Sequence, residues 1–408
     1  MELQREAFYI GIDLDDNWTQ ISYYLKDMAE PETVSTIAGG QRYRIPTALC
    51  KRQELGAWYL VDVQGEQEEY ARVDMLLARA LKKEQIQGEI DAEELLVAFM
   101  RKVIRLIPGL VEFAQIQAVT VHMEELNLTK VQLLTQVLER IGISGERIFV
   151  QDSMESFCHF VMHQKKELRQ HEVVLFSCKE HRVSSFILTK EEKTMPRKVQ
   201  IQKQELGILP QKAEERDKSF AAMAEEILKG RIVSAIYLVG EGMDGDWLKD
   251  SLHILCRNRR VFQGKNLYTK GACYESVMHM HNEEVDYVYF SENIIADNIF
   301  LQVRNGDRTF FKELAEAGTG RYELSASCQV LLEGEPIVEV WLQPPDRKEA
   351  RVEQLRLTDL PQRPPKATRL CIEIMPGEGR QVLIRIIDMG FGEWYPSSGK
   401  VWEYSIDE

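Results

Sequence analysis

Phe8-Tyr9-Ile10-Gly11-Ile12-Asp13-Leu14 is a hydrophobic run, rich in β-forming residues, close to the start of the chain. The polar turn Asp15-Asp16-Asn17 follows it, and residues 18–25 then alternate between apolar and polar in the manner of a returning strand. Two such runs joined by a short polar turn are typical of a β-hairpin. The sequence therefore predicts a hairpin over residues 8–25.

Signals for helices and strands alternate in the region that follows. Asp91 is placed to cap a helix that continues through residues 100–106, with Glu94 at the capping-box position. Residues 117–121 are apolar and predict a short buried strand, and Asn127 predicts the cap of a second helix. The apolar residues of that second helix recur at helical spacing and are Val131, Leu134, Val137, Leu138 and Ile141.

The same order of elements is predicted twice. Residues 148–150 predict a strand, and Asp152 with Glu155 marks the start of the helix that ends the first series. The second series consists of a hairpin, a helix, a strand and a helix, at residues 173–188, 220–229, 232–239 and 247–256. Strand, strand, helix, strand, helix, used twice, indicates an α/β architecture with two related lobes.

The pattern changes after residue 284. Short β-type runs separated by turn residues follow at 287–290, 299–303, 330–332, 337–342, 369–374 and 382–387. They predict a β-sandwich, in which the proline-rich segment 361–365 makes a rigid connection between strands. We therefore expect a first lobe over residues 1–171, a second lobe over residues 172–284 and a β-sandwich over residues 285–408.

Composition and charge exclude several classes of protein. The formal net charge of the 408 residues is −14, which argues against nucleic-acid binding and against adhesion to an anionic membrane. The first residues lack the basic start and apolar core of a signal peptide, and no apolar run approaches the length of a membrane span. The seven cysteines form no CxxC pair, which indicates reduced thiols and a cytoplasmic location.

Three local patterns were weighed for metal or nucleophilic chemistry. His159 with His163, four residues apart, and His279 with His281 could each begin a zinc site, but neither pair has a third ligand nearby and no HExxH segment occurs. We interpret these histidines as surface residues. Cys178 is interpreted as a structural thiol, although neighbouring cationic groups could lower its pKa. No G-x-S-x-G segment indicates a serine hydrolase.

Several segments resemble, in order, the motifs of the DnaK-type, seventy-kilodalton heat-shock chaperones of the actin-like ATPase superfamily. Residues 10–14 are similar to the first phosphate motif of that family, and 238–242 (Leu-Val-Gly-Glu-Gly) to its adenosine motif. Further segments with the same kind of similarity lie at residues 44–47, 118–121, 147–160 and 271–273. Residues 352–374 resemble the family's β-sandwich peptide-binding domain, and the sequence ends at Glu408 without the family's long helical lid.

This resemblance implies a fold, a ligand and a set of site residues. The fold would be an α/β actin-like (ribonuclease H-like) two-lobed nucleotide-binding fold, followed by an all-β sandwich without a helical lid. The ligand would be ATP or ADP with magnesium. The residues of this chain that match the nucleotide motifs, or that could supply charge to a phosphate, are Gly11, Asp13, Asp15, Asn17, Lys179, Gly240 and Gly242. No catalytic residue and no metal ligand is assigned.

The chain departs from the family's first phosphate motif at the turn itself. Family members place glycines there so that the backbone can approach the phosphates, whereas this turn is Asp15-Asp16-Asn17. A carboxylate about 4 Å from a phosphate costs roughly 4 kcal/mol at an effective dielectric constant of about 20. Only a cation, such as Lys179 or Arg182, could offset that repulsion.

The second phosphate motif and the catalytic positions depart further. The segment that aligns with the family's Asp-x-Gly-Gly-Gly-Thr is 177–182; the aspartate of this motif falls on Ser177, and the aspartate that follows the motif falls on Ser184. The glutamate of the connecting motif falls on Gln151, and no lysine occurs between residues 52 and 81, where the catalytic lysine should lie. Phosphoryl transfer depends on such groups, so we do not expect hydrolysis by the family's mechanism.

Two residue interpretations stay open at this stage. Asp13 is either a metal-directing carboxylate or a polar residue that caps the hairpin turn, and the second interpretation is slightly favoured. Gly240 and Gly242 either admit an adenine ring or end a strand before a helix, and the sequence does not separate the two.

The leading functional prediction is a bacterial, cytoplasmic, chaperone-like pseudo-ATPase. It would bind a peptide or protein partner through residues 285–408, with nucleotide binding weak or lost. One alternative is an ATP-binding or ATP-hydrolysing enzyme with a rearranged site, in which Asp13, Asp15 and Asp16 surround magnesium. Another is a structural, actin-like assembly protein. The identity of the partner, the pathway and the oligomeric state are left open.

Overall fold

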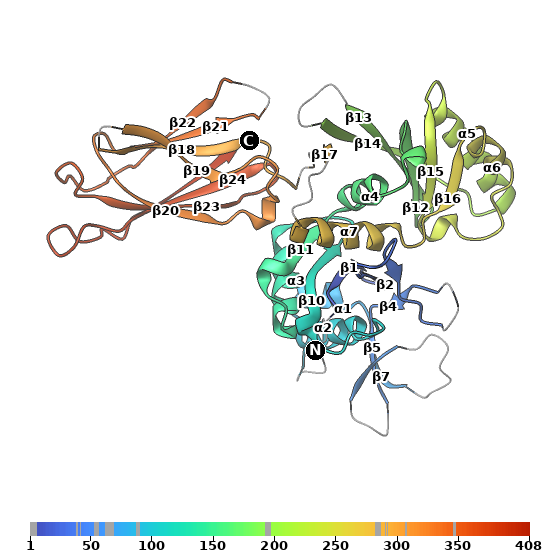
Figure 1. Cartoon of the computed structure of the whole chain (residues 1–408). Helices are drawn as coiled ribbons and strands as arrows, with labels where there is room; N and C mark the ends of the chain where they lie inside the picture. The colour runs from blue at the N-terminus through green and yellow to red at the C-terminus, as the bar shows by residue number, and fades with distance from the viewer. Residues whose placement is uncertain are drawn as a thin grey trace. The chain divides into compact units, whose positions relative to one another are not determined.

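The computed structural model describes residues 6–37, 40, 42–52, 57–61, 69–86, 90–191, 197–281, 287–289, 291, 293–306, 308–345 and 348–408. The chain divides into two units, residues 1–289 and 290–408 (Figure 1). The predicted boundary between residues 284 and 285 lies outside the described residues.

The first unit begins with a mixed sheet that contains residues 8–14 as strand β1. Strands β1 and β2 form the predicted antiparallel hairpin, which is thereby confirmed. The order of the sheet is β11-β10-β1-β2-β3, and β10 and β11 run parallel to β1, while a short strand β4 also pairs with β2. The bounds are β1 Phe8–Leu14, β2 Trp18–Tyr24, β3 Glu32–Thr33, β4 Ile45–Pro46, β10 Ile116–His122 and β11 Ile148–Gln151.

Helices α1 (Leu76–Leu81), α2 (Ala92–Ile104) and α3 (Leu128–Ile141) pack with this sheet. Asp91 and Asn127 cap α2 and α3 as predicted, accepting hydrogen bonds from the backbone of Glu93 and Lys130, both at 2.9 Å. The capping box predicted with Glu94 is wrong, because that side chain pairs with Arg140 of α3 instead.

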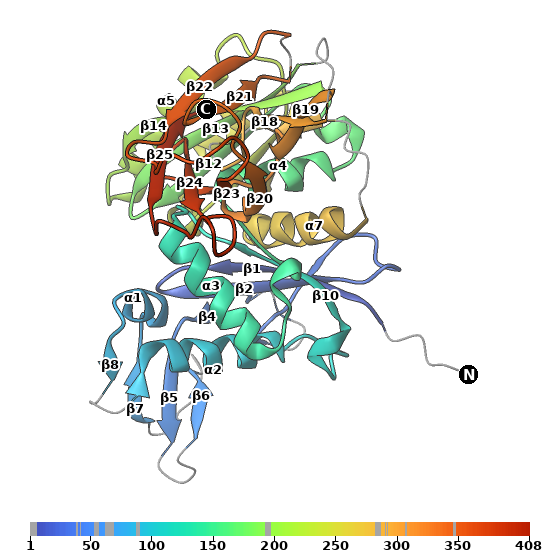
Figure 2. The same cartoon turned by 90° about the vertical axis from the view of Figure 1, so that its left-hand side faces the viewer.

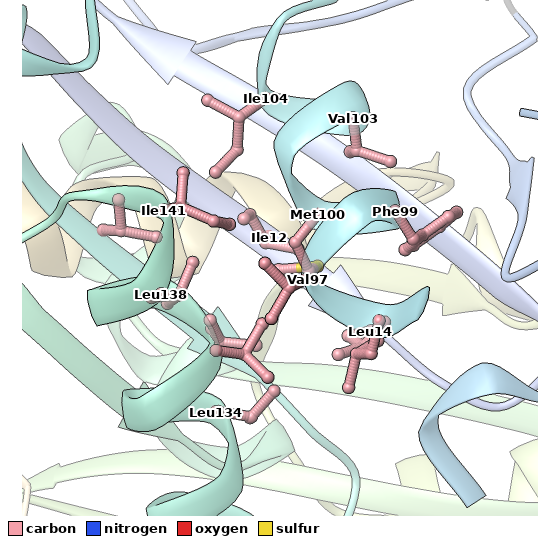
Figure 3. Close-up of a cluster of buried hydrophobic side chains, with 14 of the residues drawn as sticks. Ile12, Leu14, Val97, Phe99, Met100, Val103, Ile104, Leu134, Leu138 and Ile141 are labelled. Atoms are coloured by element: carbon pink, nitrogen blue, oxygen red, sulfur yellow. The ribbon is translucent and has the colours of Figure 1, made fainter. Parts of the chain in front are cut away.

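Side chains alternate across β1, and the two faces meet different partners. Ile10, Ile12 and Leu14 are buried in a core shared with α2 and α3, part of which Figure 3 shows. Each buried aliphatic side chain of this kind contributes roughly 1.5–3 kcal/mol. Gly11 faces α7 (Leu267–His281) on the other side of the strand: a Cβ there would lie 2.1 Å from the carbonyl oxygen of Thr269. Only glycine therefore lets this helix approach the strand.

Two small sheets of the first unit were not predicted. Strands β5 (Leu49–Arg52), β6 (Trp58–Leu60) and β7 (Glu69–Val73) form a three-stranded sheet, and β8 (Gln85–Ile86) pairs with β9 (Ile90–Asp91). These strands are two to five residues long, too short to give a periodic pattern.

The second large sheet has the order β16-β15-β12-β13-β14-β17. Its predicted hairpin, β12 with β13, is confirmed. Strand β14 was missed because most of its side chains are exposed and carry no apolar pattern. The bounds are β12 Glu172–Lys179, β13 Arg182–Glu191, β14 Arg197–Ile208, β15 Val233–Val239, β16 Arg260–Gln263 and β17 Tyr287–Tyr289.

Strand β17 corrects one assignment made from the sequence. The run 287–290 was expected in the β-sandwich, but Tyr287–Tyr289 pairs with β14 and so belongs to the first unit. Phe290, the last residue of that run, lies outside the described residues.

The two large sheets repeat one topology. In each, three strands form an antiparallel meander, and two later strands run parallel to the first: β3-β2-β1-β10-β11 and β14-β13-β12-β15-β16. The helix that follows the last of these strands in each sheet packs against the other sheet, so the two helices are exchanged between the sheets. Helix α7 follows β16 but lies on β1 and β10 (Figure 2). Helix α4 (Ser153–Met162) follows β11 but shares a core with β12 and β13.

Contacts at the crossing of α4 and α7 leave no room for a side chain. A Cβ on Gly271 of α7 would lie 2.0 Å from the carbonyl oxygen of Ser156 in α4. Helix α4 begins with the predicted capping box, in which the side chains of Asp152 and Glu155 each accept a hydrogen bond from the backbone N–H of the other residue. Residues 271–273, which resemble a family motif, lie inside α7, which begins at Leu267.

The remaining helices of the first unit differ from prediction at their ends. Helix α5 (Ala213–Leu228) begins at Ala213 rather than at Phe220. Helix α6 (Asp250–Leu255) is shorter than the predicted 247–256. Its start is fixed by the buried carboxylate of Asp217 in α5, which accepts hydrogen bonds from the backbone of Lys249, Asp250 and Ser251.

The second unit consists of two four-stranded antiparallel sheets that share one hydrophobic core (Figure 1). Their orders are β19-β18-β21-β22 and β20-β23-β24-β25. The strands predicted at 299–303, 330–332, 337–342, 369–374 and 382–387 are present, with somewhat different ends. The bounds are β18 Asn298–Asn305, β19 Arg308–Ala315, β20 Ala326–Leu331, β21 Ile337–Gln343, β22 Arg351–Arg356, β23 Arg369–Pro376, β24 Gln381–Asp388 and β25 Val401–Asp407.

Two further features complete the description. The proline-rich segment 361–365 connects β22 and β23, as predicted. None of the helices within the described ranges is both long enough and apolar enough to cross a membrane.

Candidate functional site

A cleft of about 610 Å³ lies in the first unit, where the two large sheets meet. The carboxyl ends of the parallel strands β1, β10, β12 and β15 contribute to it, as do the N-terminal ends of α4 and α7. Ligands of open α/β sheets bind at the carboxyl ends of parallel strands. This cleft is therefore the candidate site.

Five of the seven residues singled out from the sequence line the cleft: Asp13, Asp15, Asn17, Lys179 and Gly240. Gly11 and Gly242 do not line it. Gly11 is covered by α7, as described above, and a Cβ on Gly242 would lie 2.2 Å from Cys178 Sγ. These two glycines are explained by close packing.

Gly240 is likewise required by its backbone. Its φ is +97°, and a Cβ there would lie 2.2 Å from the carbonyl oxygen of Cys178. The turn after β15 thus packs against the end of β12 at Gly240 and at Gly242. Cys178 is buried in that contact, and burial raises the pKa of its thiol, which is the opposite of an activated nucleophile.

Asp13, at the end of β1, begins a chain of polar contacts. Its Oδ1 lies 2.7 Å from Nδ1 of His122 at the end of β10. Nε2 of the same ring lies 3.0 Å from Oγ of Ser153, the first residue of α4. The imidazole is buried and stacks on Tyr268 of α7, with ring centroids 4.5 Å apart.

Tyr268 completes this polar group. Burial, followed by the charge of Asp13, raises the pKa of its hydroxyl well above the usual value, although the nearby side chains of Ser177 and Ser153 act to lower it. The sequence indicated Asp13 but neither His122 nor Ser153. His122 is 109 residues from Asp13, and only the parallel pairing of β1 with β10 brings them together.

The turn after β1 is held by its own carboxylate. Asp15 Oδ1 accepts hydrogen bonds from the backbone of Asn17 at 2.6 Å and of Trp18 at 2.7 Å. Burial raises the pKa of Asp15, against the lowering effect of these bonds. Asp16 does not line the cleft. Within the described ranges, no three His, Cys, Asp or Glu side chains gather closely enough to hold a metal ion.

Lys179, the candidate phosphate-binding cation, already has a carboxylate partner. Its Nζ lies 2.5 Å from Oε2 of Glu124, which follows β10 on the other side of the cleft. Burial lowers the pKa of Lys179, but the hydrogen bond and charge of Glu124 and the charges of Asp15 and Asp13 raise it further, so the net pKa is raised. A second ion pair, Arg44 with Asp244 at 3.7 Å, also joins a residue near the first large sheet to one near the second.

Acidic side chains predominate in the cleft lining. The acidic residues are Asp13, Asp15, Glu124, Asp152, Glu180, Glu205, Glu241 and Asp244. The basic residues are Arg44, Lys179, Arg182, Lys203 and Lys265. A ligand with several negative charges would meet net repulsion here.

A second group of titratable residues lies at the crossing of α4 and α7. Glu275 has one carboxylate oxygen 2.7 Å from His159 Nε2 and the other 2.8 Å from His279 Nε2. Burial acts to raise the pKa of Glu275, but the two histidines outweigh it and hold that pKa far below its usual range. His279 is exposed, as the interpretation of a surface histidine requires, whereas His159 is partly buried, and both bind the carboxylate of Glu275.

The histidines that were paired by their spacing in the sequence contact other residues in the structure. His163 stacks on Tyr274, with ring centroids 4.1 Å apart, and His279 stacks on Phe149 at 3.8 Å. The side chain of His281 lies outside the described residues.

Comparison with known families assigns both parts of the chain. Residues 294–407 match a domain of unknown function (DUF8552). No curated protein matches the chain. Residues 30–292, more than half of the chain, match the C-terminal part of a family of unknown function (DUF5716). The chain therefore belongs to the family of unknown function DUF5716.

Proposed function

We propose that this chain is a chaperone-like pseudo-ATPase, an actin-like scaffold whose C-terminal unit binds an extended apolar segment of a protein partner. The repeated strand order of the two large sheets and the exchange of α4 and α7 support the actin-like part of this proposal. Cys158, Cys178 and Cys273 are buried thiols, which supports a cytoplasmic location.

The chemistry of the cleft supports the loss of ATP hydrolysis. Asp13, which would direct a metal in the chaperones, is bonded to His122, and Lys179 is paired with Glu124. The turn of Asp15 offers carboxylates where the phosphates would need backbone amides. A nucleotide would have to break these pairs and overcome the negative charge of the lining.

The observation that carries the proposed binding activity is an apolar strip on the second unit. Phe300 and Trp341 are paired neighbours on β18 and β21, and Val352 of β22 pairs with Trp341. Phe311 of β19 packs against both aromatic neighbours, with centroids 6.3 Å from Phe300 and 5.2 Å from Trp341. Ile299 and Val340, which directly precede Phe300 and Trp341 in the sequence, are buried in the core. The strip thus lies on the outward face of the sheet.

The strip ends at an edge strand. Strand β19 is the terminal strand of its sheet, and its first six residues are exposed, with Phe311 51% exposed. Edge strands accept an additional strand through backbone hydrogen bonds, while side-chain pockets give specificity. An extended segment with aromatic or aliphatic side chains fits this edge and the strip beside it.

Peptide binding by the full chain tests the proposal. Fluorescence anisotropy with labelled, extended apolar peptides should show binding by the wild type. Phe311→Ser should raise Kd about tenfold or more, since loss of a well-buried aromatic contact costs roughly 1.5–3 kcal/mol and 1.4 kcal/mol is a factor of ten.

Leu331→Ser is the matched control, because Leu331 is 46% exposed on β20, the edge strand of the other sheet. It should leave Kd within about twofold. Absence of peptide binding by the wild type, or equal losses in the two variants, would rule out this use of the strip.

A further inference from the structure

We propose that Ser153, His122 and Asp13 form a nucleophilic site in the cleft that hydrolyses small carboxylic esters. This inference does not depend on partner binding by the second unit. It concerns an activity different from the ATP chemistry that the cleft has lost.

The three side chains have the mutual distances that such a site needs. A nucleophile and its base lie within about 2.6–3.2 Å, and a third group orients the base. Here Ser153 Oγ lies 3.0 Å from His122 Nε2, and Asp13 Oδ1 lies 2.7 Å from His122 Nδ1. All three side chains line the cleft, and Ser153 is partly exposed to it.

The surroundings fix the imidazole in a useful state. Asp13 accepts a hydrogen bond from Nδ1–H, which leaves the Nε2 lone pair free to accept the proton of Ser153. The ring is buried and held flat against Tyr268, so it cannot turn away. Asp13 also stabilises the imidazolium that forms when the proton is transferred. Asp13 acts through His122 and is a positioning residue.

Tyr268 supplies a hydrogen-bond donor beside the nucleophile. Its ring stacks on His122, with ring centroids 4.5 Å apart, and Tyr268 lines the same cleft as Ser153. A neutral tyrosine hydroxyl can donate to the oxyanion of a tetrahedral intermediate. The backbone amides of Met154 and Glu155 are not available for this, because Asp152 accepts both of them.

The proposed reaction is balanced without a cofactor. Ser153 Oγ attacks the ester carbonyl carbon while its proton passes to His122 Nε2, and a tetrahedral intermediate forms. The carbon–oxygen bond to the alcohol then breaks, and His122 returns the proton to the departing alkoxide. Water, deprotonated by the same nitrogen, attacks the acyl-serine and releases the carboxylic acid with the serine restored.

The charge and size of the cleft define the class of substrate. A volume of about 610 Å³ is within the usual range of small-molecule sites. The excess of carboxylates in the lining disfavours anionic acyl groups and favours neutral or cationic ones. The substrate is therefore a small neutral ester, or one that carries an ammonium group.

Covalent labelling of the full chain tests the site directly. A fluorophosphonate probe should modify wild-type protein, and mass spectrometry of the peptides should place the adduct on Ser153. The same protein should hydrolyse 4-nitrophenyl acetate, and Ser153→Ala should lose labelling and reduce hydrolysis by about 10³-fold or more.

Two further variants separate catalysis from structure. Ser184→Ala is the matched control, because Ser184 lines the same cleft but its hydroxyl contacts Glu205 at 2.8 Å and no histidine of the described residues. It should keep labelling and rate within about twofold. Asp13→Asn should lower kcat about 10³–10⁴-fold with little change in KM, since it acts on the tautomer of the base.

An adduct on another residue, or wild-type protein that neither reacts with the probe nor hydrolyses the ester faster than Ser153→Ala, would overturn the assignment. The adduct map needs no variant, so the test holds even if Ser153→Ala folds poorly.

Discussion

At the scale of single residues, buried charges have the strongest effect on stability. In the second unit, the carboxylate of Asp388 is fully buried, and its two oxygens lie 2.8 and 2.9 Å from the guanidinium nitrogens of Arg363. Ser398 and the backbone of Gly390 also donate to it. Burial acts to raise the pKa of Asp388, but these bonds outweigh it and hold that pKa far below its usual range.

Replacing Arg363 by Met should destabilise the second unit by about 3–5 kcal/mol, because the buried Asp388 carboxylate loses its charged partner. Urea unfolding followed by tryptophan fluorescence measures the loss. Lys366→Met is the control: Lys366 pairs with Glu333 at 3.5 Å on the exposed surface, and its replacement should cost about 0–1 kcal/mol. Equal losses would mean that the Arg363–Asp388 pair is not a main source of stability.

The same carboxylate predicts a pH dependence. The folded pKa of Asp388 lies below its unfolded value of about 3.9, so its stabilising effect is complete above that value and decreases as the pH falls toward the folded pKa. Unfolding between pH 6 and pH 3 should therefore show stability falling with acid, and the fall should be smaller in Arg363→Met. An acid dependence unchanged by the substitution would contradict this assignment.

Glu275 in the first unit makes a related prediction. Glu275→Gln replaces a carboxylate between His159 and His279 with an amide that cannot accept from both, and should cost about 1–3 kcal/mol of unfolding free energy. Glu226→Gln, on the exposed side of α5, should stay within about 0.5 kcal/mol. Circular dichroism in denaturant compares them. A loss no larger than that of the control would show that the histidines contribute little.

The candidate site could be predicted from the sequence only in part. Asp13 was indicated by the resemblance of residues 10–14 to a phosphate motif, and the structure places it next to the last residue of β1, in the lining of the cleft. His122 and Ser153 carry no local signal: His122 is the last residue of an apolar strand, and Ser153 follows a helix cap. Their meeting depends on the parallel pairing of β1, β10 and β11, which short-range patterns do not specify.

At the scale of elements, both hairpins and most helix caps were correct from the sequence. Strands β14, β19 and β22 were missed because most of their side chains are exposed, so they lack the apolar alternation that marks a half-buried strand. The exchange of α4 and α7 was not foreseen either. It rests on backbone approaches at Gly11 and Gly271 that only coordinates reveal.

Gly271→Ala tests this packing. Alanine is intrinsically favoured over glycine in a helix by about 1 kcal/mol. A Cβ here would lie 2.0 Å from a backbone oxygen of α4, so the variant should nevertheless lose about 1–3 kcal/mol or more. Gly145→Ala is the control, because its Cβ would meet only the end of the flexible Glu139 side chain at 2.7 Å. Thermal unfolding compares them, and a more stable Gly271→Ala would refute close packing of α4 on α7.

At the scale of the whole molecule, the two units carry different parts of the proposed function. The first unit contains the cleft, in which Lys179 is already paired with Glu124 and Asp13 with His122. The second unit carries the edge strand β19 and the apolar strip. The proposal of a pseudo-ATPase requires that the first unit responds little to nucleotide, whatever the second unit binds.

Thermal unfolding of the full chain with magnesium and millimolar ATP, ADP or neither measures that response. A ligand at a hundred times its Kd stabilises the native state by about 2.7 kcal/mol, so a working nucleotide site would raise Tm clearly. We expect no change in Tm with either nucleotide, because Lys179 is engaged by Glu124 and the cleft lining is acidic. A clear rise in Tm with ATP or ADP would contradict the pseudo-ATPase and favour a nucleotide-binding enzyme or sensor.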